Sequence, residues 1–271
     1  MSNFLKIEIE TITEEDSEIL IADLSEISFY AFEQEENSLI AYIKEEDFNE
    51  EKLNNALPLQ CICKITTIKD ENWNQQWESG FQPVIINDFA AIRASFHEPV
   101  KSVKHELIIT PKMSFGTGHH ATTFLMVELM GKIDFHHKTV LDFGTGTGVL
   151  AILAEKLGAS KITAIDYDEW SINNTLENIE ANNCTNIFVE RKDSLSGISF
   201  VNIIIANINL NVLTEASSSI SELLKKGSLL LTSGFLFTNE EVMVNVFTGK
   251  GFVKRSVLRK DDWLAILFEK M

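Results

Sequence analysis

Residues 139–152 read TVLDFGTGTGVLAI, and this stretch decides the fold. A short apolar strand ends in Asp142, the chain turns through Gly144, Gly146 and Gly148, and an apolar helix follows. Glycine adopts positive φ without strain and lets a ligand approach the backbone closely, while the last glycine would let the helix pack tightly on the strand. The pattern predicts a strand, a ligand-binding turn and a helix, which is the repeating unit of a parallel α/β sheet.

The acidic residues around this turn indicate which ligand it would hold. Asp166 ends a second predicted strand, 162–165, and a carboxylate there can accept hydrogen bonds from both ribose hydroxyls of a nucleoside. Dinucleotide-binding loops read G-x-G-x-x-G and aim a helix N-terminus at a pyrophosphate. This loop reads G-x-G-x-G, and Asp142 would repel phosphate. S-adenosylmethionine, whose sulfonium and amino groups are cationic, is therefore favoured over NAD or FAD, and a glycine turn without a ligand is the plain alternative.

A second glycine-rich loop lies upstream. Residues 114–123 read SFGTGHHATT and lead into an apolar helix predicted over 124–130. Thr122 and Thr123 are candidate caps of that helix, and their hydroxyls could also contact the methionine end of the cofactor.

An asparagine follows the strand predicted over 201–206, at Asn207-Ile208. Open α/β sheets bind their ligands at the carboxyl ends of such strands. The side-chain oxygen of Asn207, or a neighbouring carbonyl, can accept a hydrogen bond from a nucleophilic amine and orient its lone pair. The alternative is a turn residue that caps its own backbone.

The charge distribution divides the chain. Residues 1–68 hold 16 acidic and 4 basic residues, whereas residues 69–271 hold 24 and 19. The first segment has a β-α-β-β-α-β pattern, typical of a ferredoxin-like α+β domain; its strands are predicted from Phe4 and over 30–32, 39–43 and 61–68, and its helices over 14–26 and 48–57. Residues 69–82, with Trp73 and Trp77, are interpreted as a linker. Residues 83–271 begin with strands 84–86, 90–94 and 106–109 and continue as a doubly wound, Rossmann-like sheet.

Composition excludes several function classes. The net charge of −17 argues against a basic surface that wraps nucleic acid. We find no apolar run of about 18–20 residues and no cationic signal peptide, so we expect a cytoplasmic protein without a membrane partner. Histidines and cysteines show no metal-ligand spacing, so no metal is expected. Nothing in the sequence demands a second copy, and we expect a monomer.

On these motifs the chain resembles the PrmA family, the ribosomal protein L11 methyltransferases, along essentially its whole length. The family signature F-G-T-G-x-H-x-T-T matches residues 115–123, and D-x-G-x-G-x-G matches residues 142–148. The acidic ribose position matches Asp166, and the Asn-Ile pair matches Asn207-Ile208. The chain departs from the family at Thr145 and Thr147, where Cys and Ser are usual, and after Asn-Ile, where Asn209-Leu210 replaces Leu-Ala.

The resemblance implies an enzyme that transfers methyl groups from S-adenosylmethionine to lysine ε-amines and the N-terminal α-amine of ribosomal protein L11. The negative charge of residues 1–68 suggests that this domain recognises the basic substrate. Asn207 and Ile208 would align the acceptor amine. His120 is either a proton acceptor or a support for the glycine loop, and no proton transfer is assigned to it. The residues implied in cofactor binding are Gly118, His120, Thr122, Thr123, Asp142, Gly144, Gly146, Asp166 and Asn207.

Several alternatives stay open. The chain could methylate RNA or a small amine, although it lacks the Asn-Pro-Pro-Tyr run that would favour adenine or glutamine amides. It could also bind S-adenosylmethionine without turnover. Acidic residues 1–68 either attract a basic substrate or are simply solvated helix faces. Asp193-Ser194 either contacts the adenine amine or forms an ordinary loop. Glu177-Asn178 and Asn182-Asn183 are interpreted as the polar end of a helix.

Overall fold

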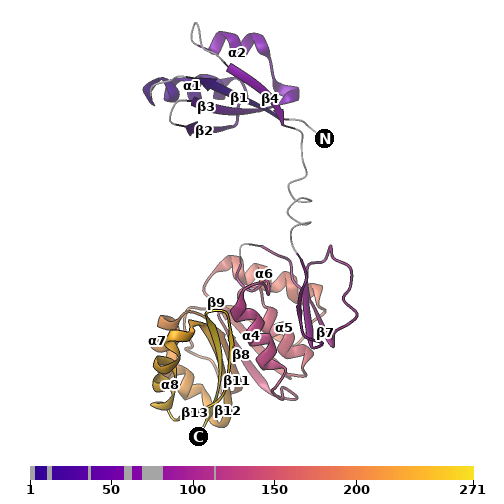
Figure 1. Cartoon of the computed structure of the whole chain (residues 1–271), viewed down its shortest axis with the longest axis vertical. Helices are drawn as coiled ribbons and strands as arrows, with labels where there is room; N and C mark the ends of the chain where they lie inside the picture. The colour runs from indigo at the N-terminus through magenta and orange to yellow at the C-terminus, as the bar shows by residue number, and fades with distance from the viewer. Residues whose placement is uncertain (1–3, 11–13, 36–37, 58–62, 69–81, 113) are drawn as a thin grey trace. The chain divides into compact units, whose positions relative to one another are not determined.

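The structure is a computed structural model that describes residues 4–10, 14–35, 38–57, 63–68, 82–112 and 114–271. The chain forms two compact units, Met1–Phe81 and Gln82–Met271, each with a hydrophobic core of its own (Figure 1). Both tryptophans of the predicted linker and Cys61 lie outside the described residues.

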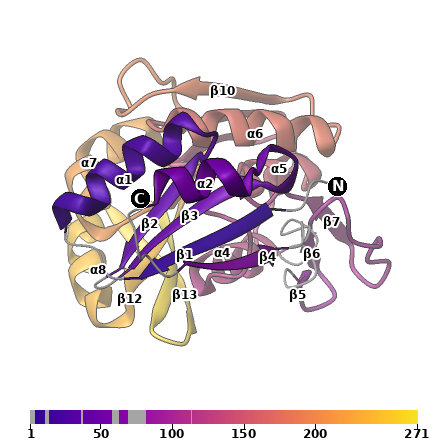
Figure 2. The same ribbon diagram turned by 90° about the horizontal axis from the view of Figure 1, so that it is seen from above.

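The first unit has the predicted β-α-β-β-α-β order. Its strands pair antiparallel in the order β2-β3-β1-β4, and α1 and α2 cover one face of the sheet (Figure 2). Apolar side chains of the helices, such as Leu24 and Leu53, pack with strand residues such as Ile7 in a core that is almost fully buried. The elements are β1 (Phe4–Glu10), α1 (Glu14–Glu26), β2 (Ala31–Glu35), β3 (Ser38–Lys44), η1 (Glu45–Asp47), α2 (Glu50–Ala56) and β4 (Cys63–Ile68).

The second predicted helix of this unit begins later than the sequence pattern indicates. We predicted a start at Phe48, but α2 starts at Glu50 because the side chain of Asn49 accepts a hydrogen bond from the N–H of Lys52 and caps the helix. Glu45–Asp47 form a separate 3-10 turn.

The described residues of the second unit form a seven-stranded sheet in the order β10-β9-β8-β11-β12-β14-β13. The first five strands in this order are parallel, whereas β14 runs antiparallel to both neighbours. The chain order reverses between β8 and β11, which is the switch point where doubly wound sheets bind ligands. The strands are β8 (Thr139–Phe143), β9 (Lys161–Asp166), β10 (Ile187–Arg191), β11 (Val201–Asn207), β12 (Leu224–Leu236), β13 (Phe252–Lys260) and β14 (Trp263–Lys270).

Helices cover both faces of this sheet, and the predicted doubly wound fold is confirmed. Along β8, Val140 belongs to the core cluster that contains α4 and α5, whereas the next residue, Leu141, belongs to the cluster that contains α7 and α8. This alternation explains why the central strands are apolar throughout rather than at every second position. The helices are α4 (Ala121–Met130), α5 (Val149–Lys156), α6 (Glu169–Ala181), α7 (Leu210–Leu223) and α8 (Glu240–Thr248), with a 3-10 turn η2 (Phe237–Asn239).

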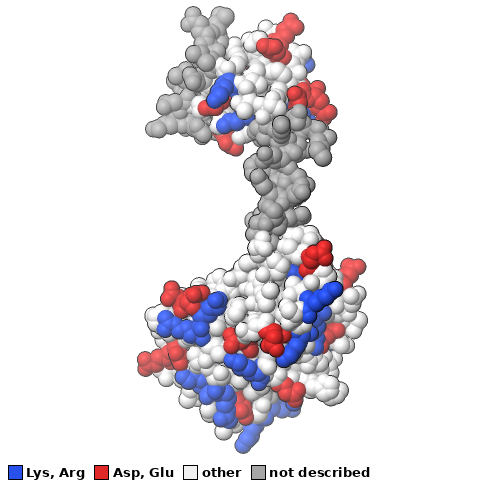
Figure 3. Space-filling model, turned by 45° about the vertical axis from the view of Figure 1, so that its right-hand side comes forward, with Lys and Arg blue, Asp and Glu red and all other residues white. Residues whose placement is uncertain are grey.

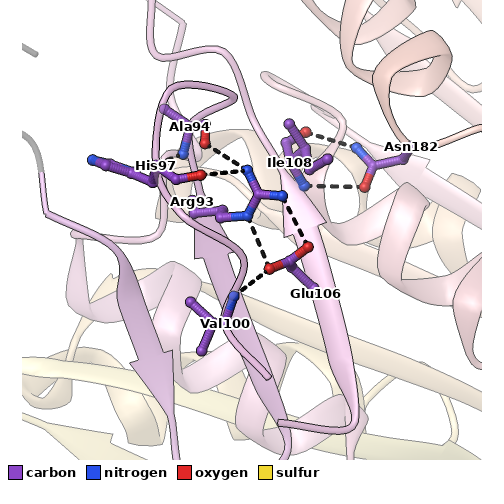
Figure 4. A network of polar contacts seen from close by, with 7 residues as sticks. All are labelled: Arg93, Ala94, His97, Val100, Glu106, Ile108 and Asn182. Carbon is purple, nitrogen blue, oxygen red and sulfur yellow. Dashed lines mark hydrogen bonds and ion pairs between the residues drawn. The ribbon is translucent and has the colours of Figure 1, made fainter. Parts of the chain in front are cut away.

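A small sheet of β5 (Val84–Ile86), β6 (Ala90–Arg93) and β7 (His105–Ile108) precedes α4. Arg93, which is 7% exposed, reaches from β6 to Glu106 on β7 (Figure 4). Its Nη2 donates to Glu106 at 3.0 Å, and its Nε lies 2.9 Å from the other carboxylate oxygen without the geometry of a hydrogen bond. The Arg93 guanidinium holds the pKa of Glu106 below its usual range. Its Nη1 also donates to the carbonyls of Ala94 and His97, which ties the following loop to the sheet.

Candidate active site

A cavity of about 430 Å³ opens where β8, β9 and β11 end. Five of the predicted site residues line it: Gly144, Gly146, Asp166, Asn207 and Ile208. They meet because parallel strands on either side of the switch point end at the same edge of the sheet. Sequence reasoning placed Asp193 near a ligand as one of two alternatives, and Asp193 does line the cavity. The other residues around it are Ser114, Phe115, Phe143, Tyr167, Asp168, Ser171, Lys192, Asn209 and Val212.

The glycine loop is interlocked with the upstream loop. The N–H of Thr147 donates to the carbonyl of Phe115 at 2.9 Å, and the Thr147 hydroxyl donates to the carbonyl of Gly116 at 2.8 Å. Gly146 has φ +57°, and a Cβ there would collide with the Phe115 carbonyl oxygen. Glycine is therefore required at this position by the close approach of the two loops as well as by its backbone angle.

Asp166 supports this loop and faces the cavity. One carboxylate oxygen accepts the N–H of Gly146 at 3.0 Å, and the other accepts the N–H of Asp168 at 3.0 Å. Each oxygen keeps lone-pair capacity for a further donor, such as a ribose hydroxyl. The two backbone donors hold the carboxylate in one orientation before a ligand arrives.

Asp168 begins α6 and stays ionised. Desolvation would raise its pKa, but hydrogen bonds from the backbone N–H and the hydroxyl of Ser171, at 3.0 Å each, outweigh that and hold the pKa below its usual range. The cavity wall thus carries a second carboxylate beside Asp166.

Asp142 lies beneath the glycine loop and does not line the cavity. Its side chain is 1% exposed and accepts a hydrogen bond from the Thr145 hydroxyl at 2.7 Å. Burial raises the pKa of Asp142 to about 7; the Thr145 hydrogen bond opposes that rise and the nearby Asp166 carboxylate adds to it.

The residues implied in the upstream loop sit behind the cavity wall. His120, rather than Thr122 or Thr123, caps α4: its Nδ1 accepts the N–H of Thr122 at 3.3 Å, because the helix starts at Ala121 and not at Phe124 as we predicted. The His120 ring also lies edge-on to Phe115 and Trp263. Both threonines are fully buried, and Gly118, with φ +93°, packs against Ile92.

The sequence left open whether Asn207 is a turn cap or an acceptor for a ligand, and the structure gives the cap to Asn209. Asn209 is the capping residue, since its side chain accepts the N–H of Val212 at 3.0 Å and begins α7. The Nδ2 of Asn207 lies 3.5 Å from the Thr123 hydroxyl oxygen. Its Oδ1 is buried and has no hydrogen-bond partner among the described residues. A buried acceptor without a partner is costly. Because Asn207 is also a lining residue of the cavity, a donor on a ligand could supply the partner.

The electrostatics of the cavity favour a cation. Asp166, Asp168 and Asp193 line it, and the lining lysine, Lys192, lies 2.9 Å from Glu190 and is partly neutralised by it. Within the described part of the chain, no group of three or more His, Cys, Asp or Glu residues is placed to hold a metal ion. The helices of these same residues lack the combination of length and hydrophobicity that a membrane-spanning segment needs.

Helix α6 carries buried asparagines that the sequence pattern did not reveal. We predicted a polar helix end at Glu177-Asn178 and Asn182-Asn183, but Asn178 is 0% and Asn182 8% exposed. They are four residues apart, so they share one helix face, and that face packs inward. The helix does end there, at Ala181 with Asn182 as its C-cap. The two amides are nevertheless buried, because backbone groups from distant segments satisfy them.

Comparisons with known proteins agree with the fold. A sequence model of the family described as ribosomal protein L11 methyltransferase (PrmA) matches residues 4–271. A Bacteroides fragilis protein named ribosomal protein L11 methyltransferase is 36% identical over 265 residues, which cover 94% of this chain and 95% of that protein. A Porphyromonas gingivalis protein of the same name is 40% identical over 260 residues, covering 93% and 90%. The crystal structure of a ribosomal protein L11 methylase from Lactobacillus delbrueckii subsp. bulgaricus has a similar fold, with a TM-score of 0.65 and 24% identity over 70% of this chain and 100% of that one.

Proposed function

The chain belongs to the ribosomal protein L11 methyltransferase family, and we propose that it transfers methyl groups from S-adenosylmethionine to lysine ε-amines and the N-terminal α-amine of ribosomal protein L11. The observation that carries the proposal is that Asn207 lines an acidic cavity and has a buried Oδ1 without a hydrogen-bond partner among the described residues. The N–H group of an acceptor amine could donate the hydrogen bond that the Asn207 Oδ1 lacks.

The residues present fit the cofactor. The cavity volume of about 430 Å³ lies within the range of small-molecule sites. Asp166 would accept the ribose hydroxyls, and the surrounding carboxylates favour a cationic sulfonium over a phosphate. When bound, S-adenosylmethionine supplies a methyl group activated by its positive sulfur. We further propose that Thr122, Thr123, Gly118, His120 and Asp142 act through the loops that they support, because they do not line the cavity.

Asn207 would act on the acceptor amine. A free lysine has a pKa near 10.4, so only about one in 10³–10⁴ is neutral at pH 7. The Asn207 Oδ1 can accept one N–H of the amine and turn its lone pair towards the methyl carbon, and Ile208 beside it closes the wall. Alignment of this kind can be worth on the order of 7–11 kcal/mol. No histidine is among the described residues that line the cavity, so we assign the proton to solvent rather than to His120.

The acidic first unit would bind the substrate. Glu46, Asp47, Glu50 and Glu51 are exposed in and around η1 and α2, and acidic side chains are visible on the described surface of this unit (Figure 3). A negative surface steers a cationic protein towards the enzyme and raises the association rate, most strongly at low salt. We propose that it acts as a monomer, in the cytoplasm where ribosomal proteins are made.

Transfer of a radiolabelled methyl group tests the function. The full chain is incubated with labelled S-adenosylmethionine and either purified L11 or ribosomal large subunits, and protein is then separated from RNA. We expect label in the L11 band. Label in RNA or in a small amine instead would refute methylation of L11 and show that the chain methylates that other acceptor. Cofactor binding without any label in protein, RNA or added amines would identify a non-catalytic module.

Charge-neutralising variants test the role of the first unit. Changing Glu46, Asp47, Glu50 and Glu51 to glutamine or asparagine should lower kcat/KM for L11 and flatten its salt dependence, while cofactor affinity stays unchanged. The matched control changes four exposed glutamates of the second unit to glutamine, which alters net charge equally: Glu180, Glu215, Glu222 and Glu241. Equal loss in both variants would show that only net charge matters and would refute docking on the first unit.

A further inference from the structure

Helix α6 contacts the glycine loop and the segment that leads into the Phe115 loop, through side chains that sequence reasoning did not assign to any function. Asn174, Asn178 and Asn182 follow one another at intervals of four residues and are buried, and Thr175 is buried beside them. Four-residue spacing puts the asparagines in one row along the helix. Burying so many amides is unfavourable unless each one is hydrogen-bonded. The hydrogen-bond partners of these asparagines therefore indicate the role of this face of α6.

Asn178 connects two segments that are far apart in the sequence. Its Oδ1 accepts the N–H of Thr110 at 2.8 Å, just before the loop that carries Ser114 and Phe115. Its Nδ2 donates to the carbonyl of Thr147 in the glycine loop, also at 2.8 Å, and to Asn174 at 2.6 Å. Both amide hydrogens and the amide oxygen are used, so the side chain is held in one orientation.

Two successive residues of the glycine loop, Gly146 and Thr147, each form one hydrogen bond through the backbone N–H and another through the backbone carbonyl. Gly146 donates its N–H to Asp166 and accepts the Thr175 hydroxyl at its carbonyl, at 2.8 Å. Thr147 donates its N–H to Phe115 and accepts Asn178 at its carbonyl. A loop with positive φ at Gly144, Gly146 and Gly148 has little regular structure to keep its shape, so these outside contacts set it.

We infer that Asn178, assisted by Thr175, is a positioning residue for the proposed cofactor site, a role that rests on the proposed function. It holds the glycine loop against the Phe115 loop and so keeps both walls of the cavity at the separation that a ligand requires. Loss of this hold lets the loop populate shapes that do not bind, and apparent affinity falls in proportion to the competent fraction. The rate at saturating cofactor is then largely kept, because binding restores the loop.

Asn182 offers a matched control one helix turn away. It is the same residue type on the same face, and it also uses both ends of its amide, on the carbonyl and N–H of Ile108 (Figure 4). It contacts β7 and its own helix, at the carbonyl of Asn178, but within the described part of the chain it forms no hydrogen bond with the glycine loop or the Phe115 loop. Its removal should lower stability without changing the cavity.

The test measures binding of S-adenosylhomocysteine to the full chain by calorimetry. Asn178→Ala should raise the Kd about tenfold, the effect of losing one to two well-formed hydrogen bonds, and raise the KM for S-adenosylmethionine similarly. The kcat at saturating cofactor should stay within about twofold. Asn182→Ala should leave the Kd within about twofold of the original chain, although its melting temperature falls.

Hydrogen exchange gives a readout that needs no ligand. The amides of Thr147 and Gly148 should exchange faster in Asn178→Ala than in Asn182→Ala, because only the first variant releases the loop. Should Asn178→Ala not fold, Thr175→Val removes the hydroxyl that holds Gly146 while keeping the shape of the side chain, and it should weaken binding about three- to tenfold.

The possible failures are distinguishable. An unchanged Kd in both Asn178→Ala and Thr175→Val, or an equal loss in Asn182→Ala, overturns the inference and leaves the proposed function intact. If the original chain binds no S-adenosylhomocysteine, the proposed function fails, and the exchange comparison still decides whether Asn178 holds the loop.

Discussion

The side chain of Asn207 is held from one end only: its Nδ2 lies 3.5 Å from the hydroxyl oxygen of Thr123, while its Oδ1 is buried and, among the described residues, unpartnered. The contact joins the end of β11, where Asn207 lines the cavity, to the first turn of α4, which does not line it. A polar side chain with one weak contact and one unused acceptor is unusual in a protein interior. The unused acceptor is explained if a donor on the substrate forms a hydrogen bond with the Oδ1 of Asn207.

Asn207→Ala should lower kcat for methylation of L11 about 100-fold at saturating cofactor, because misalignment by about 1 Å can cost that much. Cofactor affinity should change far less. Steady-state rates with purified L11 measure both. Thr123→Val, which removes only the long contact, is the matched control and should lower kcat by no more than about fivefold. A normal kcat in Asn207→Ala would exclude this side chain from amine alignment.

Asp166→Ala should weaken binding of S-adenosylmethionine by about 1.5–3 kcal/mol, since hydrogen bonds to a charged group are lost. Calorimetry measures the change. The 2′-deoxy analogue of the cofactor distinguishes a contact with the ribose from support of the loop. The original chain should bind this analogue more weakly than S-adenosylmethionine. The Asp166→Ala variant should bind the two compounds about equally well. If the hydroxyl matters equally in both proteins, Asp166 does not contact it.

Gly146→Ala should abolish cofactor binding and destabilise the chain, because the added Cβ collides with the carbonyl oxygen of Phe115. Gly227→Ala is the control: Gly227 also has positive φ, +82°, but nothing lies within 4 Å of its added Cβ. Backbone strain alone costs about 1–2 kcal/mol, which is the loss expected at Gly227. Denaturant unfolding with calorimetry compares the pair, and similar results at the two positions would contradict the interlocked loops.

Asp142→Asn should change how stability depends on pH. The pKa of Asp142 is raised to about 7 by burial, whereas that of the unfolded chain is near 3.8. The folded state therefore keeps a proton that the unfolded chain has released, and the stability this contributes is complete below pH ~4 and is lost as pH rises through about 7.

The asparagine variant has no such proton to lose. Its free energy of unfolding, relative to the original chain, should rise between pH 5 and pH 8 by an amount on the order of a few kcal/mol. Urea unfolding at several pH values measures the difference. Parallel pH profiles for the two proteins would show that Asp142 is ionised in the folded state throughout this range.

The elements predicted correctly from sequence are those whose signal is local. The helix Glu14–Glu26 and the strand Val84–Ile86 have the predicted bounds, and the central strands appear as apolar runs because both of their faces are buried. For the end of the chain, the sequence pattern predicted only strands that alternate with helices, and it did not reveal that β13 and β14 form an antiparallel hairpin. Its pairing depends on which sheet edge the chain reaches, and this is not a local property.

Caps and buried polar residues were predicted less well. A histidine caps α4 where two threonines were expected, because the helix begins three residues earlier. Asn178 and Asn182 lie at the end of a helix, as predicted, but the sequence pattern did not reveal that they are buried. The sequence pattern could not distinguish the two outcomes, since a buried amide and a solvated one have the same local spacing.

By itself, the sequence determined the glycine turn, the carboxylate at the end of β9 and the asparagine at the end of β11, because each follows from a strand that ends and a chain that must turn. Only the tertiary structure decided which polar groups remain available to a ligand. Asn209 uses its oxygen on its own helix, Asn178 uses its amide on two distant loops, and Asn207 keeps an acceptor free of any described partner. Hydrogen bonds of this kind pair groups that are far apart in the chain, so they are settled when the elements pack.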